Sequence, residues 1–122
     1  MNPRPDQSKR ARGRWGEDRA CSLLERSGFI VLDRNWRSPE PHVRGELDVV
    51  ASADDLLVFC EVKARRRATF GGAACAVDAR KQEQIRHLAA SWLRTHDVDH
   101  ERIRFDVIAI DGVRVEHLDA AF

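Results

Sequence analysis

Hydrophobic and polar positions alternate over much of the chain, and this alternation is typical of β-strands. It predicts five strands, at residues 29–37, 45–52, 56–64, 103–110 and 113–118. Two other stretches repeat apolar residues at helical spacing, one beginning near Arg14 and one running from Asp78 to about Thr95. The predicted order of elements is therefore α-β-β-β-α-β-β, an α/β fold.

Glycine and proline mark the connections between these elements. Gly28 is the predicted C-terminal cap of the first helix. Pro39 and Pro41 predict a loop before the second strand, because proline denies a ladder hydrogen bond. The first 12 residues contain two prolines and no hydrophobic periodicity, so we expect a flexible basic arm there. Residues 13–122 then form a single domain.

Composition and charge narrow the class of protein. The chain has 122 residues, a net charge of +1 and 43% hydrophobic residues, as in an ordinary globular domain. Three cysteines without a CxxC pair indicate free buried thiols in a reducing compartment. The start of the chain lacks the apolar core of a signal peptide, and no apolar run approaches the roughly 20 residues of a membrane helix. We therefore expect a cytoplasmic protein with no membrane partner.

Four charged side chains interrupt the second and third predicted strands. Because side chains alternate along a strand, Glu46 and Asp48 share one face of the second strand, and Glu61 and Lys63 share one face of the third. A two-residue turn between these strands predicts that Asp48 lies opposite Glu61 and Glu46 opposite Lys63. Opposed residues in an antiparallel pair have Cβ atoms about 4.5–5.5 Å apart.

Two carboxylates at that distance repel each other, and three arrangements would relieve the repulsion. One carboxyl group takes up a proton because its pKa is raised. Alternatively, a cation such as Lys63 or Arg65 neutralises the pair, or a divalent metal ion bridges both acids. Mg²⁺ suits the last arrangement, because it prefers oxygen ligands and commonly uses only one or two carboxylates. A plainer interpretation is also open, in which the four charges form a solvated outer surface with ion pairs between the strands.

The residues from Arg14 to the end of the chain resemble a known family. Asp48, a gap of twelve residues and EVK at 61–63 resemble the PD-(D/E)xK nuclease pattern, with Leu47 in place of its proline. In order, the segments WGEDRACSLLERSGFIVLDRNWR, GELDVVA, LLVFCEVKAR, Lys81 and RFDVIAI are similar to the YraN-like uncharacterised family of bacterial proteins. That family is similar to Holliday-junction resolvases within the restriction-endonuclease-like superfamily. The resemblance implies a mixed β-sheet flanked by helices.

The resemblance also implies a role for each residue of the motif. Asp48 and Glu61 match metal-ligating acids, and the main-chain carbonyl of Val62 is a further ligand. Lys63 matches the lysine of the motif, and Glu17 matches a first acidic residue on the leading helix. The implied activity is that of an endonuclease that uses Mg²⁺ or Mn²⁺ and acts on DNA, with branched structures among its substrates. Resolvase-like relatives work as dimers, so the resemblance adds a homodimer to the candidate partners and leaves the oligomeric state open.

Basic residues near the acids are candidate contacts for nucleic acid. Arg65, Arg66 and Arg67 follow the third strand, and Lys81 matches a basic position at the start of the second helix. Cationic side chains that contact phosphates would make binding depend on salt. The alternative for such a run of charges is a solvated face. Since a fold does not fix a function, the alternative function is a nuclease-like module that binds nucleic acid, or serves as an accessory, without cutting.

Overall fold

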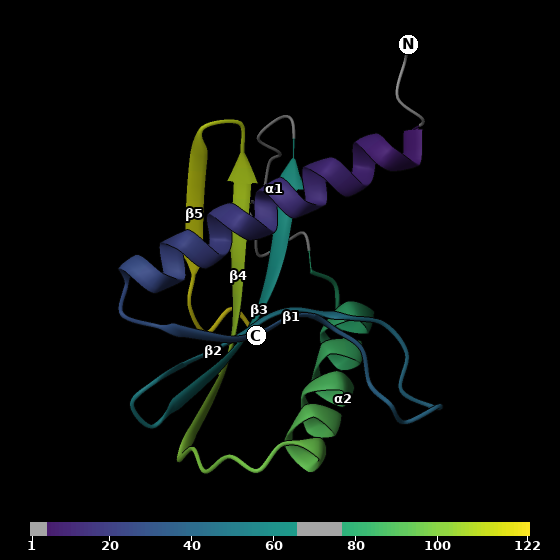
Figure 1. Cartoon of the computed structure of the whole chain (residues 1–122), viewed down its shortest axis with the longest axis vertical. Helices are drawn as coiled ribbons and strands as arrows, with labels where there is room; N and C mark the ends of the chain where they lie inside the picture. Colours follow the sequence, from purple (N-terminus) through teal and green to yellow (C-terminus); the bar gives the residue numbers. More distant parts are fainter. Residues whose placement is uncertain (1–4, 66–76) are drawn as a thin grey trace.

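The computed structural model describes residues 5–65 and 77–122, with side chains over residues 13–64 and 77–122. Figure 1 shows its helices and strands. In chain order they are α1 (Pro5–Arg26), β1 (Ile30–Trp36), β2 (Leu47–Ala53), β3 (Leu56–Arg65), α2 (Ala79–Thr95), β4 (Arg102–Asp111) and β5 (Arg114–Leu118). The predicted order α-β-β-β-α-β-β and the α/β class are both confirmed.

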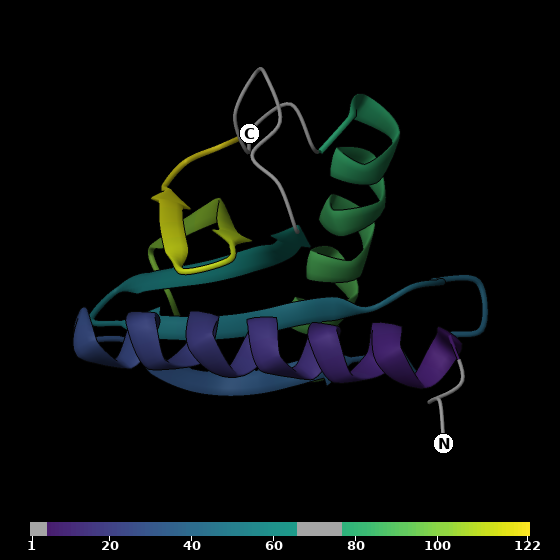
Figure 2. The same cartoon turned by 90° about the horizontal axis from the view of Figure 1, so that it is seen from above.

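The first helix begins earlier than its sequence pattern predicts. α1 starts at Pro5, so the predicted start near Arg14 is wrong, and residues 5–12 of the expected arm belong to the helix. Proline suits the first turn of a helix, because its fixed φ is already helical and it has no N–H to leave unpaired. Figures 1 and 2 show this part of α1 extending past the strands. Residues 1–4 lie outside the described residues.

The five strands form one mixed sheet in the order β1-β2-β3-β4-β5. The pairs β1–β2, β2–β3 and β4–β5 are antiparallel, whereas β3 and β4 run parallel. Parallel neighbours need a crossover connection, and α2 lies in the segment that joins β3 to β4. The sheet between helices that the resemblance implied is therefore present.

The alternation of side chains along the strands builds two hydrophobic cores, one under each helix. The core beneath α1 includes Ala20, Leu24, Val49, Val58 and Ile108. The core beneath α2 includes Val50, Phe59, Ile85, Leu88 and Trp92. Figure 2 shows the two helices on opposite faces of the sheet. Glu61 continues the row of Leu57 and Phe59 along β3, so it follows the core that α2 covers.

The turn between β2 and β3 sets the register of these strands. It contains two residues, Asp54 and Asp55, because Ala53 pairs with Leu56. The strands keep the predicted register from this turn as far as their last pair, Val49 and Cys60. The predicted acids are the next residues along the two strands.

Two predictions concern the cellular environment of the protein: free buried thiols and the absence of a membrane helix. Cys21 and Cys60 are buried and carry free thiols, as predicted, while Cys75 lies outside the described residues. Neither helix of the described ranges is both long enough and apolar enough to cross a membrane. The cytoplasmic location stays a prediction.

Candidate active site

The candidate site lies where β2 and β3 separate. Their pairing ends at Val49 and Cys60, and beyond this pair Figure 1 shows β3 continuing beside β4 while β2 runs with β1. Asp48 is the next residue on β2 and Glu61 the next on β3. The amide N–H of Val62 donates to Oδ2 of Asp48 at 2.9 Å. The carboxylate of Asp48 therefore occupies the gap between the two strands and is fixed there by the backbone of β3.

The carboxyl groups of Asp48 and Glu61 interact with each other. Burial, followed by the negative charge of Asp48, raises the pKa of Glu61 to about 7. Burial also raises the pKa of Asp48, against the opposing effects of the Val62 amide and Lys81. A hydrogen bond between the two carboxyl groups raises the pKa of Glu61 further and lowers that of Asp48, so it acts against the effect of burial on Asp48. The site therefore holds a proton on the acid pair up to about neutral pH, which is the first of the three arrangements predicted for opposed carboxylates.

Two lysines flank the acid pair. The second predicted arrangement, in which a cation neutralises the pair, is therefore also present. Nζ of Lys63 and Nζ of Lys81 each lie 3.9 Å from Oε1 of Glu61. The side chain of Glu61 is 7% exposed, whereas those of Lys63 and Lys81 are 32% and 34% exposed. Asp78 caps α2 by accepting the amide N–H of Lys81 at 2.8 Å. This cap fixes the start of α2, and with it the lysine that reaches Glu61.

The prediction that Glu46 lies opposite Lys63 is wrong, and the two side chains, both within the described ranges, form no ion pair. Oε2 of Glu46 instead lies 2.8 Å from Nη2 of Arg37, in the segment after β1. The physical reason is the separation of the strands, because β2 stays paired with β1 as far as Leu47, opposite Trp36. Residues 46 and 63 are therefore not opposed across a ladder.

Glu17 reaches the site from α1, on the other side of the sheet. Gly16 allows this approach, because a Cβ at that position would lie only 3.1 Å from the Cβ of Ala64 on β3. Nδ2 of Asn35 donates to Oε2 of Glu17 at 2.7 Å and orients the carboxylate. Burial raises the pKa of Glu17, and the charge of Asp48 raises it further. Glu17 thus belongs electrostatically to the same acidic group.

All four predicted catalytic residues line one open cavity of about 340 Å³. Its walls are Gly13, Glu17, Asp48, Glu61, Val62, Lys63 and Ala64. The side chains of Arg65, Arg66 and Arg67 fall outside those the structure describes, so their phosphate contacts stay predictions. The sequence did not indicate that Asn35 and Gly16 belong to the site, because only the docking of α1 against the sheet brings them there.

The donor atoms that line the cavity can be compared with the ligands that a divalent metal ion prefers. Two carboxylates and the carbonyl of Val62 are oxygen donors of the kind that Mg²⁺ takes, with water in its remaining positions. The residues fit such an ion in donor type. Within the described ranges, no three or more His, Cys, Asp or Glu side chains form a group that could hold a metal ion. A metal here would therefore depend on the acid pair and a main-chain oxygen.

The fold and the cavity together define a class of protein. A five-stranded mixed sheet lies between two helices. Two acids face each other where neighbouring strands separate, and a lysine follows the second acid by two residues. This combination matches the layout of the restriction-endonuclease-like class.

Comparison with known proteins identifies the family. The family model for UPF0102, an uncharacterised protein family, matches residues 16–110. A UPF0102 protein of Frankia casuarinae is 47% identical over 120 residues, which cover 94% of this chain and 98% of that relative. Another, of Syntrophotalea carbinolica, is 46% identical over 114 residues, covering 90% of this chain and 89% of the relative. The chain belongs to the UPF0102 family, which is the YraN-like family that its sequence resembles.

Proposed function

We propose that this protein is an endonuclease of the PD-(D/E)xK type that uses Mg²⁺ or Mn²⁺ to cleave DNA. The meeting of the Asp48 and Glu61 carboxyl groups beside Lys63, in one open cavity, carries the proposal. Burying two like charges together is costly, and a module that only bound a phosphate backbone would gain nothing from acids facing it. A metal ion held between the two acids would offset the repulsion between them and would give the acid pair a function.

Each residue contributes to this chemistry from its own position. Asp48, fixed by the Val62 amide, and Glu61 would hold the metal ion together with the Val62 carbonyl. The bound ion would stabilise charge on the phosphate and lower the pKa of a water molecule. Lys63, whose side chain is partly exposed, would donate a hydrogen bond to the attacking water or to a phosphate oxygen. Glu17, which lines the same cavity, would complete the acidic shell.

Cleavage assays with the purified protein test this proposal. We expect the wild type to cleave linear, single-stranded or four-way branched DNA in Mn²⁺ or Mg²⁺, and Asp48→Ala and Lys63→Ala to abolish cleavage. Asp54→Asn is the matched control, because it removes an exposed charge at the turn of the same hairpin and asparagine tolerates the positive φ of 53° there. Equal cleavage by the wild type and all three variants would reveal a contaminating nuclease and refute the proposal.

One observation favours a second function, in which the fold binds nucleic acid or a protein partner without cutting. Among the described residues no group of three metal-binding side chains is present. Calorimetric titration of Mn²⁺ into the wild type and Asp48→Asn separates the two functions without needing the right substrate. Saturable binding in the wild type that Asp48→Asn loses supports the endonuclease. Its absence from both, together with DNA binding that ignores a chelator, supports the binding module.

A further inference from the structure

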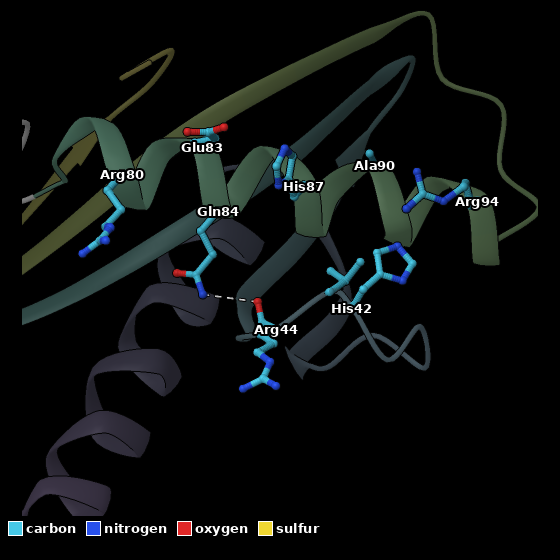
Figure 3. Close-up of a pocket in the computed structure, with 9 residues that line it drawn as sticks. His42, Arg44, Arg80, Glu83, Gln84, His87, Ala90 and Arg94 are labelled. Carbon is cyan, nitrogen blue, oxygen red and sulfur yellow. Dashed lines mark hydrogen bonds between the residues drawn. The ribbon is translucent and has the colours of Figure 1, made fainter.

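A second cavity, of about 550 Å³, opens between α2 and the loop that precedes β2 (Figure 3). We call it the basic groove. Its charged and titratable lining consists of Arg44, Arg80, Arg94, His42 and His87, with Glu83 as its acid. This groove is separate from the acid-pair cavity, since the two share no lining residue.

Contacts between α2 and both ends of the loop fix the two walls of the groove relative to each other. Toward the C-terminal end of α2, Nη2 of Arg94 donates to Oε1 of Glu40 at 2.9 Å. Toward its N-terminal end, Nε2 of Gln84 donates to the carbonyl of Arg44 at 3.2 Å, as Figure 3 shows. Gly45 adopts a φ of 101°, and a Cβ there would lie 2.5 Å from Nε2 of Gln84. Loop and helix are therefore held in close contact by groups of the chain itself.

The uncompensated positive charge of the groove comes from two arginines. Glu40 neutralises Arg94, whereas the ion pairs among the described side chains involve neither Arg44 nor Arg80. Both of these arginines are exposed. Figure 3 shows them on the same side of α2, with Glu83 projecting away from them. An anion that enters on this side meets two guanidinium groups.

One end of the groove lies at the start of α2, the part of the helix from which Lys81 reaches Glu61, and the groove follows α2 from there. Arg80 directly precedes Lys81, whose Nζ lies 3.9 Å from Glu61. From Arg80 to Arg94 the helix advances by about 21 Å, at about 1.5 Å per residue. Each strand of a duplex carries one phosphate per about 3.4 Å of axis, so this length spans several consecutive phosphates.

We propose that the basic groove binds the phosphodiester backbone of the nucleic acid on which the acid pair acts, a few phosphates from the point of cleavage. The inference rests on the proposed function for the identity of that nucleic acid. The planar guanidinium groups of Arg44 and Arg80 match pairs of phosphate oxygens. Such contacts position the substrate and carry no base specificity.

Fluorescence anisotropy with labelled oligonucleotides tests the groove in a chelator, where no cleavage can occur. Single-stranded and duplex DNA and RNA of one length are titrated with the wild type, with Arg44→Ala/Arg80→Ala, and with Arg26→Ala/Arg114→Ala. The last variant is the control, because it removes two exposed arginines that do not line the groove. A phosphate contact contributes about 0.7–0.9 to the salt exponent, so the groove variant should lose about 1.4–1.8 and bind about 25- to 60-fold more weakly at 0.1 M salt.

The control and the wild type should bind with the same affinity and salt exponent, and the tightest of the four oligonucleotides identifies the nucleic acid. An equal loss in both double variants, unchanged binding by the groove variant, or no binding by the wild type at 50 mM salt would overturn the inference. Cleavage that depends on Asp48 with unchanged binding by the groove variant would leave the endonuclease standing without the groove. Binding that depends on the groove, without any cleavage in Mn²⁺, would leave the groove standing without the endonuclease.

Discussion

Glu61→Gln should stabilise the metal-free protein at alkaline pH, although it removes a proposed catalytic residue. The side chain of Glu61 is 7% exposed, and burial and the charge of Asp48 raise its pKa from 4.5 to about 7. Above pH 7 the wild type must therefore keep two buried negative charges side by side. Glutamine carries no charge and can still donate a hydrogen bond to the carboxylate of Asp48.

The magnitude follows from the linkage between proton binding and folding. Because the pKa of Glu61 is higher in the folded state, the folded protein binds this proton more tightly than the unfolded chain does. As pH rises from 4.5 to about 7, the free energy of unfolding falls by about 1.4 kcal/mol per pH unit on account of this group. The whole interval corresponds to on the order of 3 kcal/mol. Stability from Glu61 is thus complete below pH 4.5 and lost by about pH 7.

Urea unfolding in a chelator at pH 4, 6 and 8, followed by circular dichroism, measures this difference. Glu61→Gln should exceed the wild type by on the order of 3 kcal/mol at pH 8 and match it at pH 4. Glu83→Gln, which changes an exposed glutamate on α2, should follow the wild type throughout. A wild type that equals or exceeds Glu61→Gln at pH 8 would mean that the two lysines outweigh burial and repulsion, and the reasoning would be refuted.

Two further pairs of variants test the packing and the ion pairs around the sheet. Gly16→Ala should destabilise the protein by about 1–3 kcal/mol, because its Cβ would press α1 away from β3. Gly13→Ala, with nothing within 4 Å of its new Cβ, should stabilise α1 by about 0.5–1 kcal/mol; a similar loss in both would contradict the close approach. Asp106→Ala removes a fully buried acceptor of Arg104 and should cost about 3 kcal/mol in urea unfolding. Asp55→Ala, which breaks an exposed ion pair, should cause no measurable loss, and an equal loss would show that burial is not decisive.

The hairpin was predictable from sequence because two local signals agree on its register. The alternation of apolar residues fixes which side chains face the cores, and the two-residue turn at Asp54 and Asp55 fixes which residues are opposed. Together they place Asp48 next to Glu61 without knowledge of any other element. The start of α1 was not predictable in this way, because residues 5–12 form a helix without an apolar stripe to mark it.

The partners of the acids could not be predicted, because they come from elements far away in sequence. Lys81 reaches Glu61 only because α2 docks on one face of the sheet. Asn35 reaches Glu17 only because α1 docks on the other face. The wrong partner assigned to Glu46 has a related cause. The register argument assumed that the ladder continues, and no residue pattern marks the point at which β2 leaves β3.

The separation of β2 and β3 explains how groups from both faces of a sheet can meet in one cavity. In a continuous ladder, the amide of Val62 would point at the backbone of a neighbouring strand, and side chains on opposite faces would stay apart. Where the strands separate, that amide binds Asp48 instead. The gap admits Glu17 from the side of α1, while Glu61 remains in contact with Lys81 of α2. The cavity is therefore a consequence of where the pairing ends, and the acid pair lines it because it follows the last paired residues.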